Sequence, residues 1–229
     1  MRAMILAAGR GERMRPLTDV CPKPMLAVGG RPLIEYHLEN LAAAGVDEVV
    51  INLAWKGAMI REALGDGVRF GLRIQYSDEG DEALDTGGGI YKALEMLGPD
   101  PFLVLSGDIW TDYPLARCLT LPASEDLGHW VLVANPMFHA HGDFCLRNGR
   151  LHDGGGPRYT YANIGVFRPA FFAACDGGRF ALAPLMFEWL RRGRISGELY
   201  QGAWYNIGTP EQLAQLDAQL VRGDTAPAG

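Results

Sequence analysis

The sequence has few of the features that mark disulfide-rich or zinc-binding proteins. Its 229 residues include four cysteines, which lie far apart at Cys21, Cys118, Cys145 and Cys175. No Cys-x-x-Cys pair occurs and no histidine has the spacing of a zinc ligand, which argues against a disulfide framework and a structural zinc site. We therefore expect free thiols in a reducing compartment.

Long apolar runs are also missing. The stretch Met4–Ala8 is apolar, but the polar residues Gly9–Arg13 interrupt it, so it is too short for the apolar region of a signal peptide. No other run approaches the roughly 20 residues of a membrane-spanning helix. These absences predict a soluble, cytoplasmic protein with no membrane partner.

Positive charge is not in excess. The chain has 21 Lys and Arg against 27 Asp and Glu, a net charge of −6, which predicts no broad basic surface and no nucleic-acid partner. A nucleotide needs only a small local cluster of cations, so a nucleotide enzyme stays possible. The five histidines are scattered, and no Ser-His-Asp set or reactive cysteine is spaced for nucleophilic catalysis.

What the sequence does contain is an alternation of strand and helix patterns. In the first half, residues 3–7, 49–53, 72–76 and 102–105 have strand patterns, and helical patterns follow at 33–44, 58–64 and 90–97. In the second half, strands are predicted at 130–134 and 162–167, a hairpin turn at Asn148-Gly149, and helices at 182–190 and after Thr209-Pro210. This order predicts one α/β domain with a Rossmann-like, mixed but mainly parallel sheet, helices on both faces and a small antiparallel insertion.

Several polar clusters follow predicted strands, where open α/β sheets bind ligands. The loop after the first strand, residues 6–15, is rich in glycine and arginine, a composition that forms an anion-binding nest. Two prolines flank Lys23 and stiffen its loop. Asp108 follows the fourth strand, where a carboxylate can bind Mg²⁺, and residues 85–89 open a helix whose N–H groups can take an anion. Together these clusters predict phosphoryl-type transfer, which depends on positioning and charge neutralisation.

The order of these motifs resembles the signature of the sugar-1-phosphate nucleotidylyltransferases. The resemblance begins with residues 6–18 (LAAGRGERMRPLT), continues with 22–26 (PKPML) and 31–34 (RPLI), and extends to 85–89, 107–108, 163–165 and 206–209. Among the subfamilies, residues 78–89 are most similar to the short enzymes that use UTP and N-acetylmuramate 1-phosphate in bacterial cell-wall recycling.

The resemblance implies a mechanism and a set of roles. The sugar phosphate would attack the α-phosphorus of the nucleoside triphosphate directly and in line, with residues 1–112 mainly binding the nucleotide and 113–221 mainly the sugar. The residues implied are Arg13, Lys23 and Asp108 for catalysis, Ala7, Ala8, Gly9, Gly11, Gly87 and Gly88 for the nucleotide, Gly142, Asp153 and Asn163 for the sugar, and Asp108 with Asn206 for Mg²⁺.

Two positions depart from the family pattern. Asn206 stands where many relatives carry a second metal-binding aspartate, and an amide oxygen can still bind Mg²⁺ but contributes no charge. Residues 152–158 contain no lysine to bind the sugar phosphate, so we expect Arg158 to substitute for it. We also expect the lactyl carboxylate of muramate to meet Arg147, Arg158 or Arg179.

Three other functions are compatible with parts of the sequence. A nicotinamide-binding Rossmann enzyme is disfavoured because Met14 occupies the place of the third glycine. A non-catalytic nucleotide-sugar sensor is disfavoured by the presence of Arg13, Lys23 and Asp108. A nucleotidyltransferase for mannose, glucose or N-acetylglucosamine 1-phosphate stays open, because fold and motif do not determine the acceptor. The sequence also leaves open the choice between UTP and dTTP and the oligomeric state.

Overall fold

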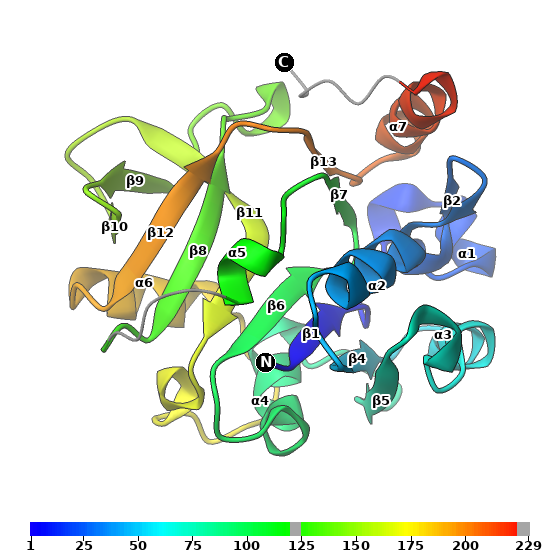
Figure 1. Ribbon diagram of the computed structural model, residues 1–229, viewed down its shortest axis with the longest axis horizontal. Coiled ribbons are helices and arrows are strands. Elements are labelled where there is room, and N and C mark those ends of the chain that lie inside the picture. The colour runs from blue at the N-terminus through cyan, green and yellow to red at the C-terminus, as the bar shows by residue number, and fades with distance from the viewer. Residues whose placement is uncertain (120–124, 224–229) are drawn as a thin grey trace.

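A computed structural model describes residues 1–119 and 125–223. The strands of its main sheet are β1 (Ala3–Leu6), β4 (Glu48–Leu53), β5 (Arg73–Asp78), β6 (Phe102–Ser106), β8 (Gly128–Val133), β9 (Phe144–Arg147), β10 (Arg150–His152), β11 (Arg158–Phe167) and β12 (Ile195–Tyr200). They are ordered β5-β4-β1-β6-β11-β8-β12-β10-β9 (Figure 1). Two short ribbons pair β2 (Ala27–Val28) with β3 (Arg31–Pro32) and β7 (Ile109–Thr111) with β13 (Trp204–Asn206).

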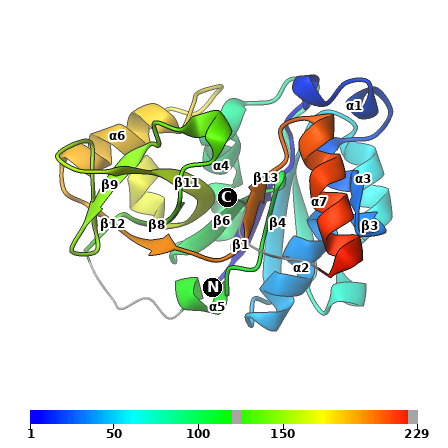
Figure 2. The same cartoon turned by 90° about the horizontal axis from the view of Figure 1, so that it is seen from above.

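Helices cover the sheet. They are α1 (Leu17–Val20), α2 (Leu33–Ala43), α3 (Gly57–Leu64), α4 (Asp85–Leu97), α5 (Ala116–Leu119), α6 (Ala183–Arg191) and α7 (Pro210–Arg222). Figure 2 shows α2, α3 and α7 beside the parallel half of the molecule and α6 beside the antiparallel half. Within the described residues, no helix has both the length and the apolar character needed to cross a membrane.

The parallel half consists of β1, β4, β5 and β6. β1 pairs in parallel with β4 and β6, and β4 pairs in parallel with β5, so their carboxyl ends meet at one edge. Ala3 and Ile5 pack with the apolar faces of α2 and α3, whereas Met4 packs with α4 on the opposite face. This alternation along a strand buried on both sides is what the sequence predicts, because successive side chains of a strand point to opposite faces.

The mainly antiparallel half, in which β8 and β12 pair in parallel, is larger than the predicted insertion. β11 pairs with β6, β8 and β9, and β10 pairs with both β9 and β12, so β11, β8, β12, β10 and β9 form a closed circuit of pairings. Trp130 is fully buried there, with its ring centroid 5.4 Å from that of Phe144 and 6.0 Å from that of Phe167. The α/β fold class is confirmed, but β12 was not predicted from the sequence.

The start of α4 differs from the sequence-based expectation. The helix begins at Asp85 rather than Ile90, so Gly87, Gly88 and Gly89 lie in its first turns. Glycine normally disfavours a helix by about 1 kcal/mol, and here it serves close packing. A Cβ on Gly87 would lie 2.5 Å from the ring of Phe180, and one on Gly88 only 2.2 Å from the carbonyl oxygen of Gly178.

Candidate active site

A cavity of about 480 Å³ lies at the carboxyl ends of β1, β4 and β6. Each of these strands contributes its last residues to the lining, as expected for an open α/β sheet. The lining residues are Leu6, Ala7, Ala8, Gly9, Gly11, Glu12, Arg13, Met14, Lys23, Pro24, Asn52, Glu79, Ala83, Asp85, Thr86, Ser106, Asp108, Asn163 and Gly208. The cavity thus gathers residues from both halves of the chain.

The glycine-rich loop after β1 forms one wall of this cavity. The backbone N–H of Ala7 donates a 2.7 Å hydrogen bond to Asn52 Oδ1. In the described part of the chain, the N–H groups of Ala8, Gly9, Arg10 and Gly11 donate no hydrogen bond. Unpaired N–H groups in succession form an anion-binding nest, so the part of the loop suited to phosphate starts after Ala7.

Lys23 and Asp108 meet at the cationic end of the cavity. Lys23 Nζ lies 2.6 Å from Asp108 Oδ2, and the two side chains are 11% and 28% exposed. The short helical turn Lys23–Met25 positions the lysine, and the Ile207 N–H holds the backbone oxygen of Asp108 at 2.8 Å. Asp108 Oδ1 is buried and has no hydrogen-bond partner among residues 1–119 and 125–223. The aspartate therefore has one oxygen paired with a cation and a second oxygen that remains to be satisfied.

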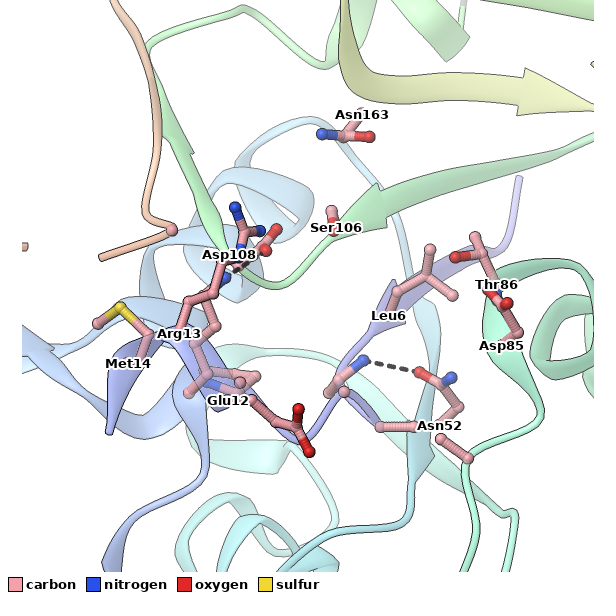
Figure 3. A pocket seen from close by; sticks show the side chains of 18 of the residues that line it. Leu6, Glu12, Arg13, Met14, Asn52, Asp85, Thr86, Ser106, Asp108 and Asn163 are labelled. Carbon is pink, nitrogen blue, oxygen red and sulfur yellow. Dashed lines mark hydrogen bonds and ion pairs between the residues drawn. The ribbon is translucent and has the colours of Figure 1, made fainter. Parts of the chain in front are cut away.

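Arg13 lies near this pair. Figure 3 shows Arg13 and Asp108 together on one side of the cavity, and Asn52, Asp85 and Thr86 on the other. Gly208 lies next to the Arg13 guanidinium, and a Cβ at that position would make an ordinary van der Waals contact with it at 3.6 Å. Arg13 and Lys23 make this end of the cavity suitable for the phosphates of a nucleotide, because both carry a positive charge.

Asn163 enters the cavity from an irregular point in β11. The pairing of β11 with β8 shifts register between Tyr161 and Gly165, and Asn163 has a φ of 58°. Bulges redirect side chains, and asparagine tolerates the left-handed conformation better than most residues. The bulge therefore explains how a residue in the middle of a long strand comes to line the cavity, as the predicted sugar-binding role requires.

The wall opposite the cations contains residues that were not predicted from the sequence. Asn52 Nδ2 donates to Glu79 Oε1 at 2.7 Å, and Glu79 Oε2 accepts from the Leu84 N–H at 2.6 Å. Asn52 carries a signal in the sequence, because it is a polar residue within an apolar strand. Glu79 carries none, because it stands among several acidic residues in one loop.

The other predicted site residues do not line the cavity. Gly87 and Gly88 are buried against residues 178–180, and Gly142 and Asp153 belong to loops that flank β9 and β10. Asn206 lies in β13, opposite Ile109 and one residue along from Asp108 in that pairing. Whether these residues contact a ligand stays a prediction.

The structure assigns the Arg158 guanidinium to other groups. Its Nη1 donates to the backbone oxygen of Asp143 at 2.7 Å, and its Nη2 lies 3.2 Å from Asp153 Oδ1. Arg158 therefore connects the loop at Asp143 to the loop at Asp153. These contacts argue against its expected role as a substitute for the sugar-phosphate lysine. The other two candidate partners of a lactyl carboxylate, Arg147 and Arg179, are exposed and lie outside the cavity lining.

A magnesium site here would depend on few protein ligands. Among the described residues, no group of three or more His, Cys, Asp or Glu side chains is arranged to hold a metal ion. Mg²⁺ commonly takes only one or two carboxylates and completes its shell with water and phosphate oxygens. The unpartnered Asp108 Oδ1 fits that chemistry.

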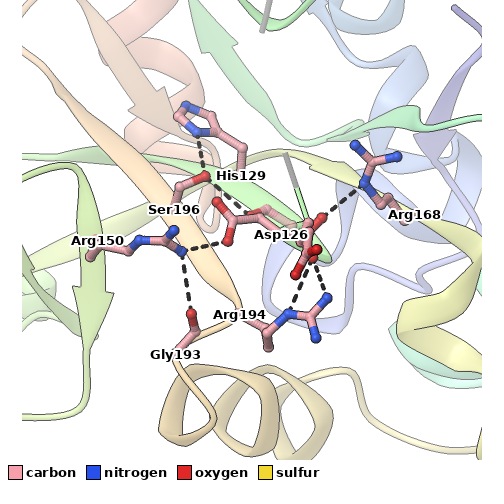
Figure 4. Close-up of polar contacts among 9 residues, drawn as sticks. Asp126, His129, Arg150, Arg168, Gly193, Arg194 and Ser196 are labelled. Atoms are coloured by element: carbon pink, nitrogen blue, oxygen red, sulfur yellow. Dashed lines mark hydrogen bonds and ion pairs between the residues drawn. The ribbon is translucent and has the colours of Figure 1, made fainter. Parts of the chain in front are cut away.

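A second cavity, of about 590 Å³, lies at the amino ends of β8 and β12. Polar contacts surround it (Figure 4): Arg168 Nε donates to the backbone oxygen of Asp126 at 2.9 Å, Arg150 pairs with the Asp126 carboxylate, and His129 Nδ1 lies 3.0 Å from Ser196 Oγ. No predicted site residue lines it, so the first cavity is the candidate active site.

A glycine-rich loop after the first strand, a lysine–aspartate pair and an α/β sheet are typical of nucleotide-binding enzymes of the transferase type. The sequence profile of the nucleotidyl transferase family matches residues 2–136. The chain belongs to that family.

Relatives support this assignment over the whole length. The chain is 45% identical to the N-acetylmuramate alpha-1-phosphate uridylyltransferase of Neisseria meningitidis serogroup B, over 95% of this chain and 97% of that protein. It is 34% identical to the Caulobacter vibrioides protein of the same name, over 96% of both chains. The fold matches a solved structure of a putative glucose-1-phosphate thymidylyltransferase from Bacillus anthracis, with a TM-score of 0.84 at 21% identity over 96% of this chain and 95% of that one.

Proposed function

We propose that this chain transfers the uridylyl group of UTP to N-acetylmuramate α-1-phosphate, with Mg²⁺, giving UDP-N-acetylmuramate and pyrophosphate. The observation that carries the proposal is the end-to-end similarity to two uridylyltransferases of that name. The cavity supports it independently, because its cations, carboxylate and unpaired N–H groups suit a magnesium nucleotide.

The residues of this chain act mainly by neutralising and positioning charge. The donor's phosphates bind between the N–H groups of the loop after Ala7 and the side chains of Arg13 and Lys23. An oxygen of the acceptor phosphate attacks the α-phosphorus in line, and a new P–O bond forms as the bond to the leaving pyrophosphate breaks. Negative charge builds up on the phosphoryl oxygens and on pyrophosphate during this step. Cations fixed in place stabilise that charge without reorganising.

The magnesium ion would be held by Asp108, with Asn206 as the proposed second ligand. When bound, it neutralises phosphate charge and aligns the phosphates. Lys23 then serves a second purpose. By binding Asp108 Oδ2 it fixes the carboxylate and leaves Oδ1 as the oxygen to be satisfied.

The acceptor binds on the side of the cavity where Asn163 enters. An N-acetylmuramate differs from N-acetylglucosamine by a lactyl carboxylate, and a protein that prefers it needs a cation at that position. Because Arg158 is engaged elsewhere, Arg147 and Arg179 remain the proposed partners. Arg147→Ala and Arg179→Ala test this part. The variant that removes the partner of the carboxylate should show a lower preference for N-acetylmuramate phosphate over N-acetylglucosamine phosphate. An unchanged preference in both would contradict this part of the proposal.

Pyrophosphate release tests the function as a whole. UTP, dTTP, GTP, ATP and CTP are each offered with the 1-phosphates of N-acetylmuramate, N-acetylglucosamine, glucose and mannose. We expect release with UTP and N-acetylmuramate phosphate. Release with a different pair would keep the family and overturn the substrates, and nucleotide binding without release under any pair would favour a sensor.

A further inference from the structure

A chain of hydrogen bonds runs along the wall of the cavity opposite Arg13 and Lys23. It runs from the Ala7 N–H to Asn52 Oδ1 (2.7 Å), from Asn52 Nδ2 to Glu79 Oε1 (2.7 Å), and from the Leu84 N–H to Glu79 Oε2 (2.6 Å). We call these four residues the Asn52 relay. The relay joins the end of β1, the end of β4, the loop after β5 and the residue that precedes α4.

The relay is enclosed by the fold. Asn52 is 4% exposed and Glu79 is 8% exposed. Gly89 of α4 lies directly against them, and a Cβ at that position would come within 2.5 Å of Glu79 Oε1 and 2.9 Å of Asn52 Nδ2. The Asn52–Glu79 pair can therefore pack against α4 only because residue 89 has no side chain.

The relay also determines which way the Asn52 carboxamide points. A flipped amide would set its NH₂ group against the Ala7 N–H and its oxygen against the Glu79 carboxylate, two unfavourable contacts. Buried polar groups that lose their partners are costly. Asn52 therefore holds Ala7 and Glu79, both of which line the cavity, at a fixed separation.

The position of the relay in the cavity indicates which part of the bound donor lies next to it. Arg13 and Lys23 attract the phosphates at the other end of the cavity, whereas Glu79 and Asp85 repel them. The nucleoside is then the part of the donor that lies next to the relay. Figure 3 shows Asn52 on the side of the cavity away from Arg13 and Asp108.

We propose that Asn52 is a positioning residue for the nucleoside of the donor, acting through Ala7 and Glu79 rather than on the reacting phosphates. This inference rests on the proposed function only in that the donor is UTP, and it does not depend on the acceptor. It assigns to Asn52 a selective effect on donor binding that a purely structural residue would not have.

Exchanging the amide of Asn52 and the carboxylate of Glu79, singly and together, tests the inference. In Asn52→Asp, a carboxylate faces the Glu79 carboxylate, and in Glu79→Gln, an NH₂ group faces either that of Asn52 or the Leu84 N–H. Each single variant should raise the dissociation constant for UTP about tenfold, because the new unfavourable contact displaces Ala7 or Glu79 from the position that holds the nucleoside.

Combining the two substitutions should reverse the effect. In the double variant, the new amide at position 79 donates to the new carboxylate at position 52 and still accepts from the Leu84 N–H. The carboxylate at position 52 also still accepts from the Ala7 N–H, so every partner is satisfied again. The UTP affinity of the double variant should return to within about threefold of the wild type.

Ser77 offers a matched control. It lies opposite Asn52 in the pairing of β4 with β5 and is 1% exposed, and its hydroxyl makes no hydrogen bond to any residue that the structure describes. Ser77→Ala should leave UTP affinity unchanged. The KM for the acceptor should stay within about twofold in all four variants, since none alters a group on the acceptor side. Thermal unfolding of each variant separates a binding defect from loss of fold.

UTP binding is measured by calorimetry with Mg²⁺ and without acceptor, so that failure of the two proposals is distinguishable. Recovery in the double variant supports the relay. A double variant as weak as the weaker single variant, or an equal rise in the acceptor KM, would overturn it. A wild type that binds UTP but releases no pyrophosphate contradicts the proposed function and leaves the relay test intact.

Discussion

Lys23 Nζ lies 2.6 Å from Asp108 Oδ2 and joins the loop before β2 to the end of β6. The two residues are 85 positions apart in the chain, and each belongs to a separate motif of the sequence. Their contact brings a cation suited to phosphates and a carboxylate suited to a metal ion to one point of the cavity. We therefore place the reacting centre at this point.

Replacing Asp108 by asparagine should remove turnover with little change of shape. The variant keeps the size of the side chain but loses its charge, and we expect kcat to fall about 10²- to 10³-fold, the usual cost of losing one preorganised electrostatic group. Asp112→Asn is the matched control, because Asp112 is exposed and bonds the Tyr200 hydroxyl outside the cavity. Steady-state pyrophosphate release measures both. Near-wild-type kcat in Asp108→Asn would show that this carboxylate is dispensable.

Two substitutions of Asn163 separate the role of its side chain in acceptor binding from the strain of its backbone. Its φ of 58° is strained for a residue with a Cβ other than asparagine or aspartate, and free for glycine. Asn163→Ala should cost about 1 kcal/mol of unfolding free energy and raise the acceptor KM, whereas Asn163→Gly should raise the acceptor KM with no loss of stability. Urea unfolding and acceptor titrations check the two effects. If both variants kept the wild-type KM, Asn163 would not bind the sugar phosphate.

Gly88 should not tolerate alanine. In an ordinary helix this change stabilises by about 1 kcal/mol, but here the new Cβ would lie 2.2 Å from the Gly178 carbonyl oxygen. We expect Gly88→Ala to lower the free energy of unfolding by about 1–3 kcal/mol, as overpacking does. Gly154→Ala has open space around it and should change stability by less than about 0.5 kcal/mol. A stabilised Gly88→Ala would mean that α4 and residues 178–180 are not in contact.

His37 should make the fold less stable in mild acid. Burial lowers its pKa from 6.5 to about 4, against smaller opposing effects of the Ile109 backbone and Asp108. As pH falls below about 6.5 the unfolded chain takes up a proton before the folded chain does, so the free energy of unfolding decreases down to about pH 4 and then levels off. The loss attributable to this group is on the order of 3 kcal/mol.

Unfolding measured by urea between pH 4 and 7.5 checks this expectation. His37→Gln should flatten the pH dependence, and His141→Gln, the same substitution at an exposed position, is the matched control. Equal slopes in the wild type and His37→Gln would assign the acid sensitivity to other groups.

Much of the fold could be predicted because local patterns and tertiary packing agree in the parallel half. The alternation of Ala3, Met4 and Ile5 between two helical layers is an example. β12 escaped prediction because its residues alternate weakly and include Gly197, where a Cβ would lie 2.5 Å from the Trp130 backbone oxygen. Such a glycine reflects a distant contact, which no local pattern contains.

The candidate site was predictable where a residue type and its place at a strand end coincide. Asp108 satisfies both conditions, Arg13 lies in the loop that follows β1, and Lys23 lies in a turn flanked by two prolines; all three line the cavity. Glu79 could not be distinguished from its acidic neighbours, because its distinction is a hydrogen bond to Asn52, 27 positions away. The contacts of Arg158 with Asp143 and Asp153 could not be predicted either, because they depend on how the loops fold against each other.

A competition assay tests the central claim most directly. The chain is given UTP and Mg²⁺ with equal concentrations of the 1-phosphates of N-acetylmuramate, N-acetylglucosamine, glucose and mannose, and mass spectrometry reads the UDP-sugars formed at early times. Because product ratios then equal ratios of kcat/KM, we predict that UDP-N-acetylmuramate predominates and that Asp108→Asn forms almost none. Predominance of another UDP-sugar, or full product formation by Asp108→Asn, would contradict this claim.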